Sequence, residues 1–145
     1  MEFIESIKQF SERVETIKDS IFTEEATKMS LIVPLFQILG YDVFNPTEFC
    51  PEYTADVGIK KGEKVDYAIL ENGSPTILIE CKSCSEQLDK HSSQLFRYFG
   101  TTSAKFGILT NGIIYRFYTD LEESNKMDLV PVSYTHLTLP TNSLV

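Results

Sequence analysis

Three residues have the types and the spacing that phosphate chemistry requires. Asp66 lies in the apolar run VDYAIL, and Glu80 and Lys82 follow the run TILI as part of the tripeptide E-C-K. The turn formers Asn72-Gly73-Ser74 between the two runs predict a β-hairpin. If Gly73 is the centre of a three-residue loop, Asp66 pairs directly with Glu80, with Cβ atoms roughly 4.5–5.5 Å apart. Strand alternation then places Lys82 on the same face as Glu80.

Two carboxylates that face each other repel, and a cation bound between them would offset this repulsion. Mg²⁺ prefers oxygen ligands and commonly uses one or two carboxylates together with water and substrate phosphate, and a neighbouring lysine can stabilise the negative charge of the transition state. A surface salt bridge of Lys82 is the alternative, and it is the commoner meaning of E-x-K alone. The hairpin context favours the metal site. Asp56 is a rival for the first carboxylate, but the hairpin register favours Asp66.

Helical and extended patterns alternate along the chain. Apolar residues spaced three and four apart predict a first helix over 3–21. Thr23, as the N-cap, predicts a second helix that ends at Gly40, and Pro34 predicts a kink or a break inside it. Strands are expected at 41–44 or 48–53, at 65–70, 76–80, 106–110 and 113–118, with a helix at about 86–100. This order predicts an α/β fold in which helices flank a mixed central β-sheet.

Length and composition limit the class of protein. The chain has 145 residues, which predicts one domain, and 42% of them are hydrophobic, which is enough for a core. Three cysteines argue against a disulfide framework and favour a reducing, cytoplasmic compartment. No apolar run approaches the ~20 residues that cross a bilayer, and the acidic start is unlike a signal peptide, so no membrane partner is expected.

The C-terminal stretch 132–145 has no pattern that connects it to the rest. The string VSYTHL resembles the translated end of a sequencing-library adapter. This resemblance predicts a domain over 1–131 and a non-native or disordered tail over 132–145, with the natural protein continuing into a missing C-terminal region. An authentic flexible C-terminus is the alternative.

The net charge of −8 weakens a nucleic-acid interpretation without excluding it. The charge is unevenly distributed, because residues 57–117 carry eight Lys or Arg against six Asp or Glu. This middle part is therefore the stretch best able to face an anion such as DNA.

The strings GEKVDYAIL and LIECK resemble the active-site hairpin of the PD-(D/E)XK nuclease superfamily, which has the restriction-endonuclease-like fold. The closer resemblance is to the N-terminal nuclease domain of type I restriction enzyme R subunits, also found in shorter phage- or mobile-element-associated proteins. It extends over about 4–128 through TEEATK, LGYDVFNP, TADVG, QLFRYF and FGILTNGIIYRFYTD. It implies a Mg²⁺-dependent DNA endonuclease, with Mn²⁺ as a substitute, that cuts internally and works with restriction-modification subunits.

The resemblance also implies residue roles. Asp66 and Glu80 would bind the metal together with the main-chain carbonyl of Cys81, and Lys82 would be the catalytic lysine. The remaining roles are a first-helix catalytic acid, a catalytic glutamine and a substrate-positioning tyrosine, which correspond to Glu25, Gln94 and Tyr98. Each has an ordinary alternative: Glu25 is also a first-turn acid that suits the helix dipole, and Gln94 and Tyr98 suit the surface and core of a helix. Val65 replaces the proline of the motif.

Other functions remain open from the sequence. The same fold hosts inactive members, so a nucleic-acid-binding or assembly module is the main alternative. Cys81 and Cys84 form a C-x-x-C string, but no second pair completes a zinc site, and His91 and His136 are unsuitably spaced, so thiol-redox chemistry is remote. No GxxxxGK[ST] motif occurs, which predicts no ATP-driven translocase in this stretch.

Overall fold

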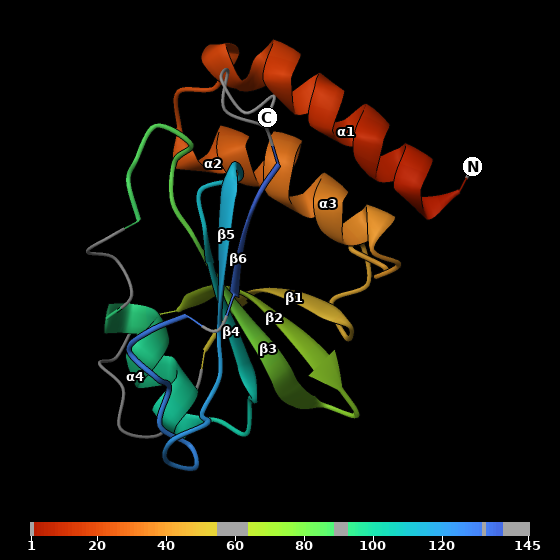
Figure 1. Ribbon diagram of the computed structural model, residues 1–145. Helices are drawn as coiled ribbons and strands as arrows, with labels where there is room; N and C mark the ends of the chain where they lie inside the picture. The colour runs from red at the N-terminus through yellow and green to blue at the C-terminus, as the bar shows by residue number, and fades with distance from the viewer. Residues whose placement is uncertain (1, 55–63, 89–92, 132, 138–145) are drawn as a thin grey trace.

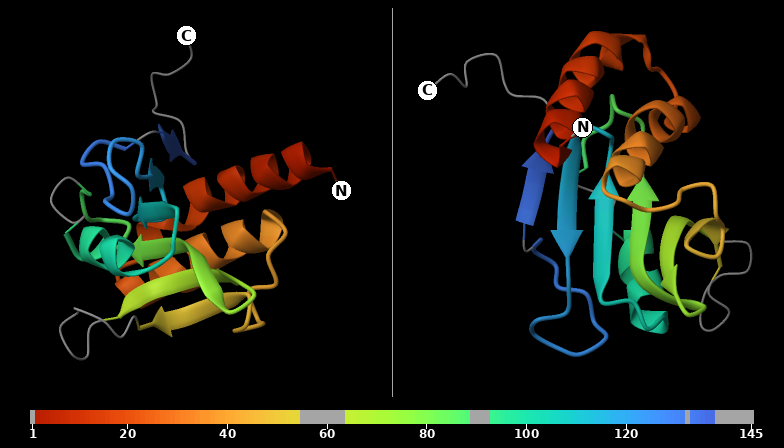
Figure 2. Two further views of the ribbon diagram at one scale, coloured as in Figure 1. Left: turned by 90° about the horizontal axis from the view of Figure 1, so that it is seen from below. Right: turned by 90° about the vertical axis from the view of Figure 1, so that its right-hand side faces the viewer.

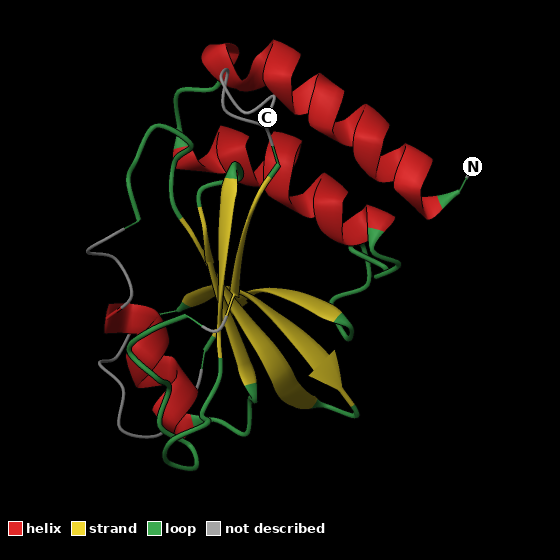
Figure 3. Cartoon of the chain, viewed as in Figure 1, coloured by secondary structure: helices red, strands yellow, loops and turns green. Residues whose placement is uncertain are grey.

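The structure is a computed structural model that describes residues 2–54, 64–88, 93–131 and 133–137. Its elements are shown in Figures 1 and 3. The helices are α1 (Phe3–Ile17), the 3₁₀ turn η1 (Lys18–Ser20), α2 (Glu24–Thr27), the π-helical turn η2 (Lys28–Ile32), α3 (Val33–Ile38) and α4 (Ser93–Thr101). The strands are β1 (Phe49–Tyr53), β2 (Val65–Glu71), β3 (Ser74–Cys81), β4 (Phe106–Thr110), β5 (Ile114–Tyr118) and β6 (Ser133–His136).

The strands form one mixed sheet in the order β1-β2-β3-β4-β5-β6. Neighbouring strands are antiparallel except β3 and β4, which run parallel. Parallel neighbours need a crossover connection, and the connection here contains α4. The predicted α/β class with helices on a mixed sheet is confirmed, and it is consistent with a restriction-endonuclease-like fold.

Helices cover both faces of the sheet (Figures 1 and 2), and each face has its own core. On one face, α1, η2 and α3 pack on strand residues such as Ile69, Ile79 and Ile108. On the other face, α4 packs on Ala68, Leu78 and further strand residues. Because side chains alternate along β2 and β3, each of these strands contributes to both cores. The central hairpin is therefore held between two apolar layers.

The β2–β3 hairpin has the predicted pairing register at the end that carries Asp66 and Glu80, but not next to its turn. Glu71 pairs with Ser74, so the loop has two residues, Asn72 and Gly73. Both have positive φ (53° and 82°), as a type I′ turn requires. The prediction of a three-residue loop was therefore wrong. A bulge between Ile69 and Leu70 shifts the pairing by one residue, and Tyr67 pairs with Ile79, so the predicted register holds where Asp66 approaches Glu80.

The N-terminal helices confirm two local predictions. The Thr23 side chain accepts a hydrogen bond from the Ala26 N–H at 3.0 Å, as an N-cap does. The second helix is interrupted by η2, which ends just before α3, and Pro34 lies in the first turn of α3. Proline has no N–H to donate to a preceding carbonyl, which accounts for an irregular helix at this point.

Other boundaries differ from the expectations. Residues 41–44 are not a strand, and of the two alternatives the structure contains 49–53. Helix α4 begins at Ser93 rather than near 86, although 89–92 lie outside the described residues. Ser133–His136 pair with β5 as strand β6, and the non-native or disordered tail over 132–145 stays a prediction. Among the described residues, no helix is both long and apolar enough to cross a membrane.

Candidate active site

Asp66 and Glu80 meet at the end of the hairpin opposite the turn. Asp66 is the second residue of β2, and Glu80 is the last but one residue of β3. The two carboxyl groups are close enough that the negative charge of Asp66 contributes to a raised pKa of Glu80. The predicted convergence of two acidic side chains across the hairpin is therefore present.

Glu80 is a buried carboxyl group. Only 4% of the residue is exposed, and its Oε1 has no hydrogen-bond partner among the described residues. Burial raises the pKa of Glu80 to about 8, with a further contribution from the negative charge of Asp66 that Lys82 only partly offsets. Glu80 therefore keeps its proton near neutral pH when no cation is bound, and its unpartnered oxygen marks a place where a positively charged ligand would stabilise the ionised form.

Lys82 lies beside Glu80, as strand alternation predicts. Its Nζ is 3.6 Å from Oε2 of Glu80, and its side chain is partly accessible. The Lys82 N–H donates to the carbonyl of Thr110 at 2.8 Å, which extends the β3–β4 pairing by one residue. This bond holds the main chain from which the Lys82 side chain reaches Glu80.

A second lysine, Lys28, enters the same cluster and was not among the expected site residues. Its Nζ is 2.8 Å from Oδ1 of Asp66 and 3.0 Å from Oε1 of Glu25. Burial alone would lower the pKa of Lys28, but hydrogen bonds to Asp66 and Glu25 outweigh it and raise the pKa above its ordinary value. The sequence signal was the spacing, since Lys28 follows Glu24 and Glu25 by four and three residues.

The two acidic residues of α2 have different surroundings. The Glu25 side chain is 84% exposed, and its ion pair with Lys28 is its contact with the cluster. Burial and the charge of Asp66 raise the pKa of Glu24, whereas Lys28 and Lys82 oppose this shift. The electrostatic field of the site therefore acts more strongly on Glu24 than sequence reasoning anticipated, while the catalytic role of Glu25 stays a prediction.

Helix α4 contributes Gln94 and Tyr98 in different ways. Nε2 of Gln94 donates a 2.7 Å hydrogen bond to the carbonyl of Lys64, the residue before β2. Gln94 therefore anchors the strand end that carries Asp66. The side chain of Tyr98 is completely buried in the core under α4, and its substrate-positioning role stays a prediction.

The cysteines show no paired arrangement. Cys50, Cys81 and Cys84 are all free, and Cys81 is completely buried. The N–H of Cys81 donates a 2.7 Å hydrogen bond to Oδ2 of Asp66. The predicted role of the Cys81 carbonyl as a metal ligand stays a prediction. The rival Asp56 and also His91 lie outside the described residues.

The donor set can be tested against a Mg²⁺ ion. Asp66 and Glu80 supply two hard carboxylates, and Oε1 of Glu80 is buried without a partner. Within the described ranges, no group of three or more His, Cys, Asp and Glu side chains is arranged to hold a metal. Mg²⁺ commonly takes one or two carboxylates and completes its shell with water and substrate phosphate, so the residues present fit this ion.

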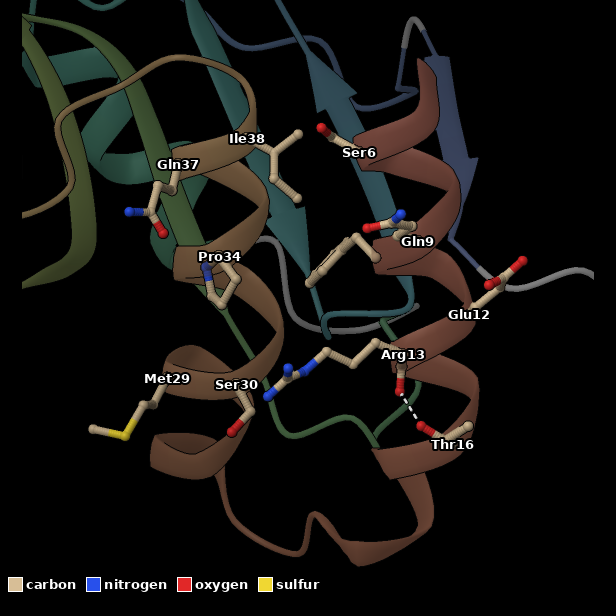
Figure 4. A pocket seen from close by; sticks show the side chains of 11 residues that line it. Ser6, Gln9, Glu12, Arg13, Thr16, Met29, Ser30, Pro34, Gln37 and Ile38 are labelled. Carbon is tan, nitrogen blue, oxygen red and sulfur yellow. Dashed lines mark hydrogen bonds between the residues drawn. The ribbon is translucent and has the colours of Figure 1, made fainter. Parts of the chain in front are cut away.

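A groove of about 970 Å³ lies between α1 and the η2–α3 segment, away from these carboxylates. Figure 4 shows Arg13 extending from α1 across the groove toward Ser30. None of the expected site residues lines this groove. The chemistry-bearing residues therefore lie at the strand ends rather than in this hollow.

Comparison with known families gives one match. Residues 57–126 match the family described as type I restriction enzyme R protein N terminus (HSDR_N). Over this range, which is just under half of the 145 residues, the chain is similar to that family. No curated protein and no solved structure gives a significant match.

The HSDR_N match confirms the resemblance to the N-terminal domain of type I restriction R subunits, and it supports a nuclease-related domain in a restriction system. The matched range includes β2, β3, α4, β4 and β5. Asp66, Glu80, Lys82 and Gln94 therefore lie inside it. Lys28 and the helix that carries it lie outside.

Proposed function

We propose that this chain is a Mg²⁺-dependent DNA endonuclease domain that hydrolyses phosphodiester bonds. The observation that carries this proposal is Glu80, a buried carboxylate that faces Asp66, has an unpartnered oxygen and lies beside Lys82. A buried carboxylate without a partner lowers the stability of the fold unless a ligand binds to it. Carboxyl groups whose pKa is strongly shifted in this way cluster at functional sites. The HSDR_N family supports a nuclease as the class of enzyme.

Asp66 and Glu80 would hold the metal, with the Cys81 carbonyl as a further ligand. When bound, Mg²⁺ polarises a phosphoryl oxygen and makes a water molecule more acidic. Asp66 and Glu80 would hold the ion, and the Cys81 N–H keeps Asp66 in place. Mn²⁺ is expected to substitute, because it accepts the same oxygen ligands.

Lys82 would act on the reacting groups directly. Its ammonium group is 3.6 Å from Oε2 of Glu80 and is partly exposed, so a phosphate at the carboxylates would be within its reach. There it would orient the attacking water and stabilise the additional negative charge on the phosphate. Gln94 would act indirectly, because its hydrogen bond to Lys64 holds the strand that carries Asp66.

The ion pair between Lys28 and Asp66 favours a second candidate function. With Nζ at 2.8 Å from Oδ1, Lys28 already neutralises one of the two carboxylates. A site in which a lysine, and not a metal ion, neutralises the carboxylate charge is expected in a catalytically inactive DNA-binding or assembly module of the same fold. The two candidates share the fold and differ in whether the carboxylates support hydrolysis.

A plasmid-nicking assay separates these candidates. Supercoiled plasmid is incubated with the wild-type chain, Asp66→Ala, Lys82→Ala and the control Lys126→Ala, with Mg²⁺, with Mn²⁺ or with EDTA. Lys126 pairs with Glu123 on the surface and its side chain is 61% exposed, so its removal tests charge loss alone. We expect metal-dependent nicking by the wild type and by Lys126→Ala, and its loss in both site variants. Equal background in all four proteins refutes the nuclease and leaves the binding module.

A further inference from the structure

Lys28 has the contacts of an internal counter-ion. Its side chain is 13% exposed and lies among three carboxylates, with Nζ at 2.8 Å from Asp66, 3.0 Å from Glu25 and 3.9 Å from Glu24. Of these, Asp66 is 15% exposed in its side chain and is one of the two carboxylates that face each other across the hairpin. An ion pair this poorly exposed is only weakly screened by salt.

Hydrogen bonds of the preceding residue hold the main chain at Lys28 in place. The preceding residue, Thr27, is completely buried, and its hydroxyl donates to the carbonyl of Thr23 and accepts the N–H of Cys84 at 3.0 Å. This second hydrogen bond ties the helix to the segment that follows β3. Lys28 then opens the π-helical turn η2, and π-helical turns are frequent at functional sites.

Lys28 and a metal ion would make competing demands on Asp66. Both are cations that need the carboxylate, and two positive charges about 4 Å apart repel each other strongly in a partly buried site. The Cys81 N–H donates to Oδ2 of Asp66 and the Lys28 ammonium group contacts Oδ1, so an ion bound at Asp66 would share an oxygen with one of these two donors. Any gain in metal contact at Asp66 must therefore weaken or displace the contact with Lys28.

We propose that Lys28 is a built-in substitute for the metal: its ammonium group holds Asp66 when no divalent cation is bound and yields to the cation when one binds. This inference rests on the proposed function, because it requires Asp66 and Glu80 to be the metal ligands. Lys28 is thus a positioning residue that sets the metal affinity of the site and keeps the poorly exposed Asp66 carboxylate compatible with a folded metal-free state.

The test measures Mg²⁺ binding by isothermal titration calorimetry for the wild type, Lys28→Met, Lys28→Arg and Lys18→Met. Lys18 pairs with Glu15 at the same three-residue spacing outside the cluster, so Lys18→Met is the matched control. We expect Lys28→Met to bind Mg²⁺ about tenfold more tightly, in the usual range of coupling between two sites. Lys28→Arg and Lys18→Met should remain close to the wild type. In metal-free buffer, Lys28→Met should also melt at a lower temperature, and Mg²⁺ should reduce that difference.

The outcomes separate this inference from the proposed function. Binding by the wild type with unchanged or weaker affinity in Lys28→Met overturns the inference and leaves the metal site intact. No binding by any of the proteins refutes both. If Lys28→Met does not fold, lysine ¹⁵Nζ NMR of the wild type decides: Mg²⁺ should shift the Lys28 ammonium signal and leave that of Lys18 unchanged, and an unchanged Lys28 signal at saturating Mg²⁺ overturns the inference.

Discussion

The main-chain N–H of Cys81 donates a 2.7 Å hydrogen bond to Oδ2 of Asp66, so the carboxylate of β2 is tied to the backbone of β3 between Glu80 and Lys82. The bond fixes one oxygen of Asp66 while the other meets Lys28. Hydrogen bonds to a charged acceptor contribute about 1.5–3 kcal/mol. The relative position of the two strands is therefore set at the same point where the candidate chemistry is located.

Glu80 should make the metal-free protein less stable as the pH rises. Its folded-state pKa of about 8 lies above the ordinary carboxyl value of 4.5, so the folded chain keeps a proton that the unfolded chain has lost. The free energy of unfolding should fall between about pH 5 and pH 8 and then level off. In urea denaturation with EDTA, the wild type should lose more than about 1 kcal/mol of unfolding free energy over this pH range, and Glu80→Gln should not show this loss. The exposed control Glu123→Gln should keep the wild-type profile, and a parallel profile for Glu80→Gln would contradict the assignment.

Gln94 should control the order of the strand end that carries Asp66. Gln94→Ala removes the donor to the Lys64 carbonyl, and Gln94→Glu replaces it with a carboxylate that repels this carbonyl. Hydrogen exchange of the first amides of β2 should therefore accelerate in both variants, and more in Gln94→Glu. The exposed Gln37→Ala on α3 is the control. If the site is a nuclease, the same variants should nick DNA about tenfold more slowly, because small misplacements are costly in catalysis. Unchanged exchange at β2 in both variants would show that the bond does not anchor the strand.

Gly112 and Gly73 should respond differently to the same substitution. Both have positive φ (85° and 82°), so alanine strains the backbone at either position. A Cβ at Gly112 would also lie 2.8 Å from Cδ1 of Leu31, whereas a Cβ at Gly73 meets nothing within 4 Å. We expect Gly112→Ala to lower the free energy of unfolding by about 2–4 kcal/mol and Gly73→Ala by about 1 kcal/mol. Equal losses in urea denaturation would mean that the β4–β5 turn does not pack against η2 as described.

The thiol groups should differ in reactivity. Cys81 is completely buried, and burial, followed by the negative charge of Asp66, raises the pKa of its thiol. Cys50 and Cys84 are partly exposed. A disulfide reagent should modify Cys50 and Cys84 in the native protein and Cys81 only after denaturation. Rapid labelling of Cys81 under native conditions would contradict this burial and would favour thiol-redox chemistry at the C-x-x-C string.

Local sequence rules were sufficient for the parts of the fold that short-range chemistry determines. The Thr23 cap and the break near Pro34 both follow from backbone preferences of single residues. The approach of Asp66 to Glu80 was also predictable, because antiparallel pairing after a tight turn leaves few registers. The parallel pairing of β3 with β4 was not, since it depends on a crossover between segments far apart in the chain.

The site itself was only half predictable for the same reason. Asp66, Glu80 and Lys82 lie on one hairpin, and their proximity follows from alternation. Lys28 reaches Asp66 from a helix 38 residues earlier in the chain. The spacing of Lys28 from Glu24 and Glu25 predicts ion pairs along the helix, but it does not report which strand end this face of the helix meets, because that contact joins segments far apart in the chain.

The bulge between Ile69 and Leu70 separates the turn end of the hairpin, which has one pairing register, from the end that carries the carboxylates, which has another. The turn end can change its turn length, acquire a substitution or carry an inserted peptide, and the bulge can absorb the resulting slip before it reaches the carboxylates. Relatives with quite different hairpin tips could therefore share the same acidic pair, and an affinity tag or fluorescent label placed at the tip should leave that pair undisturbed.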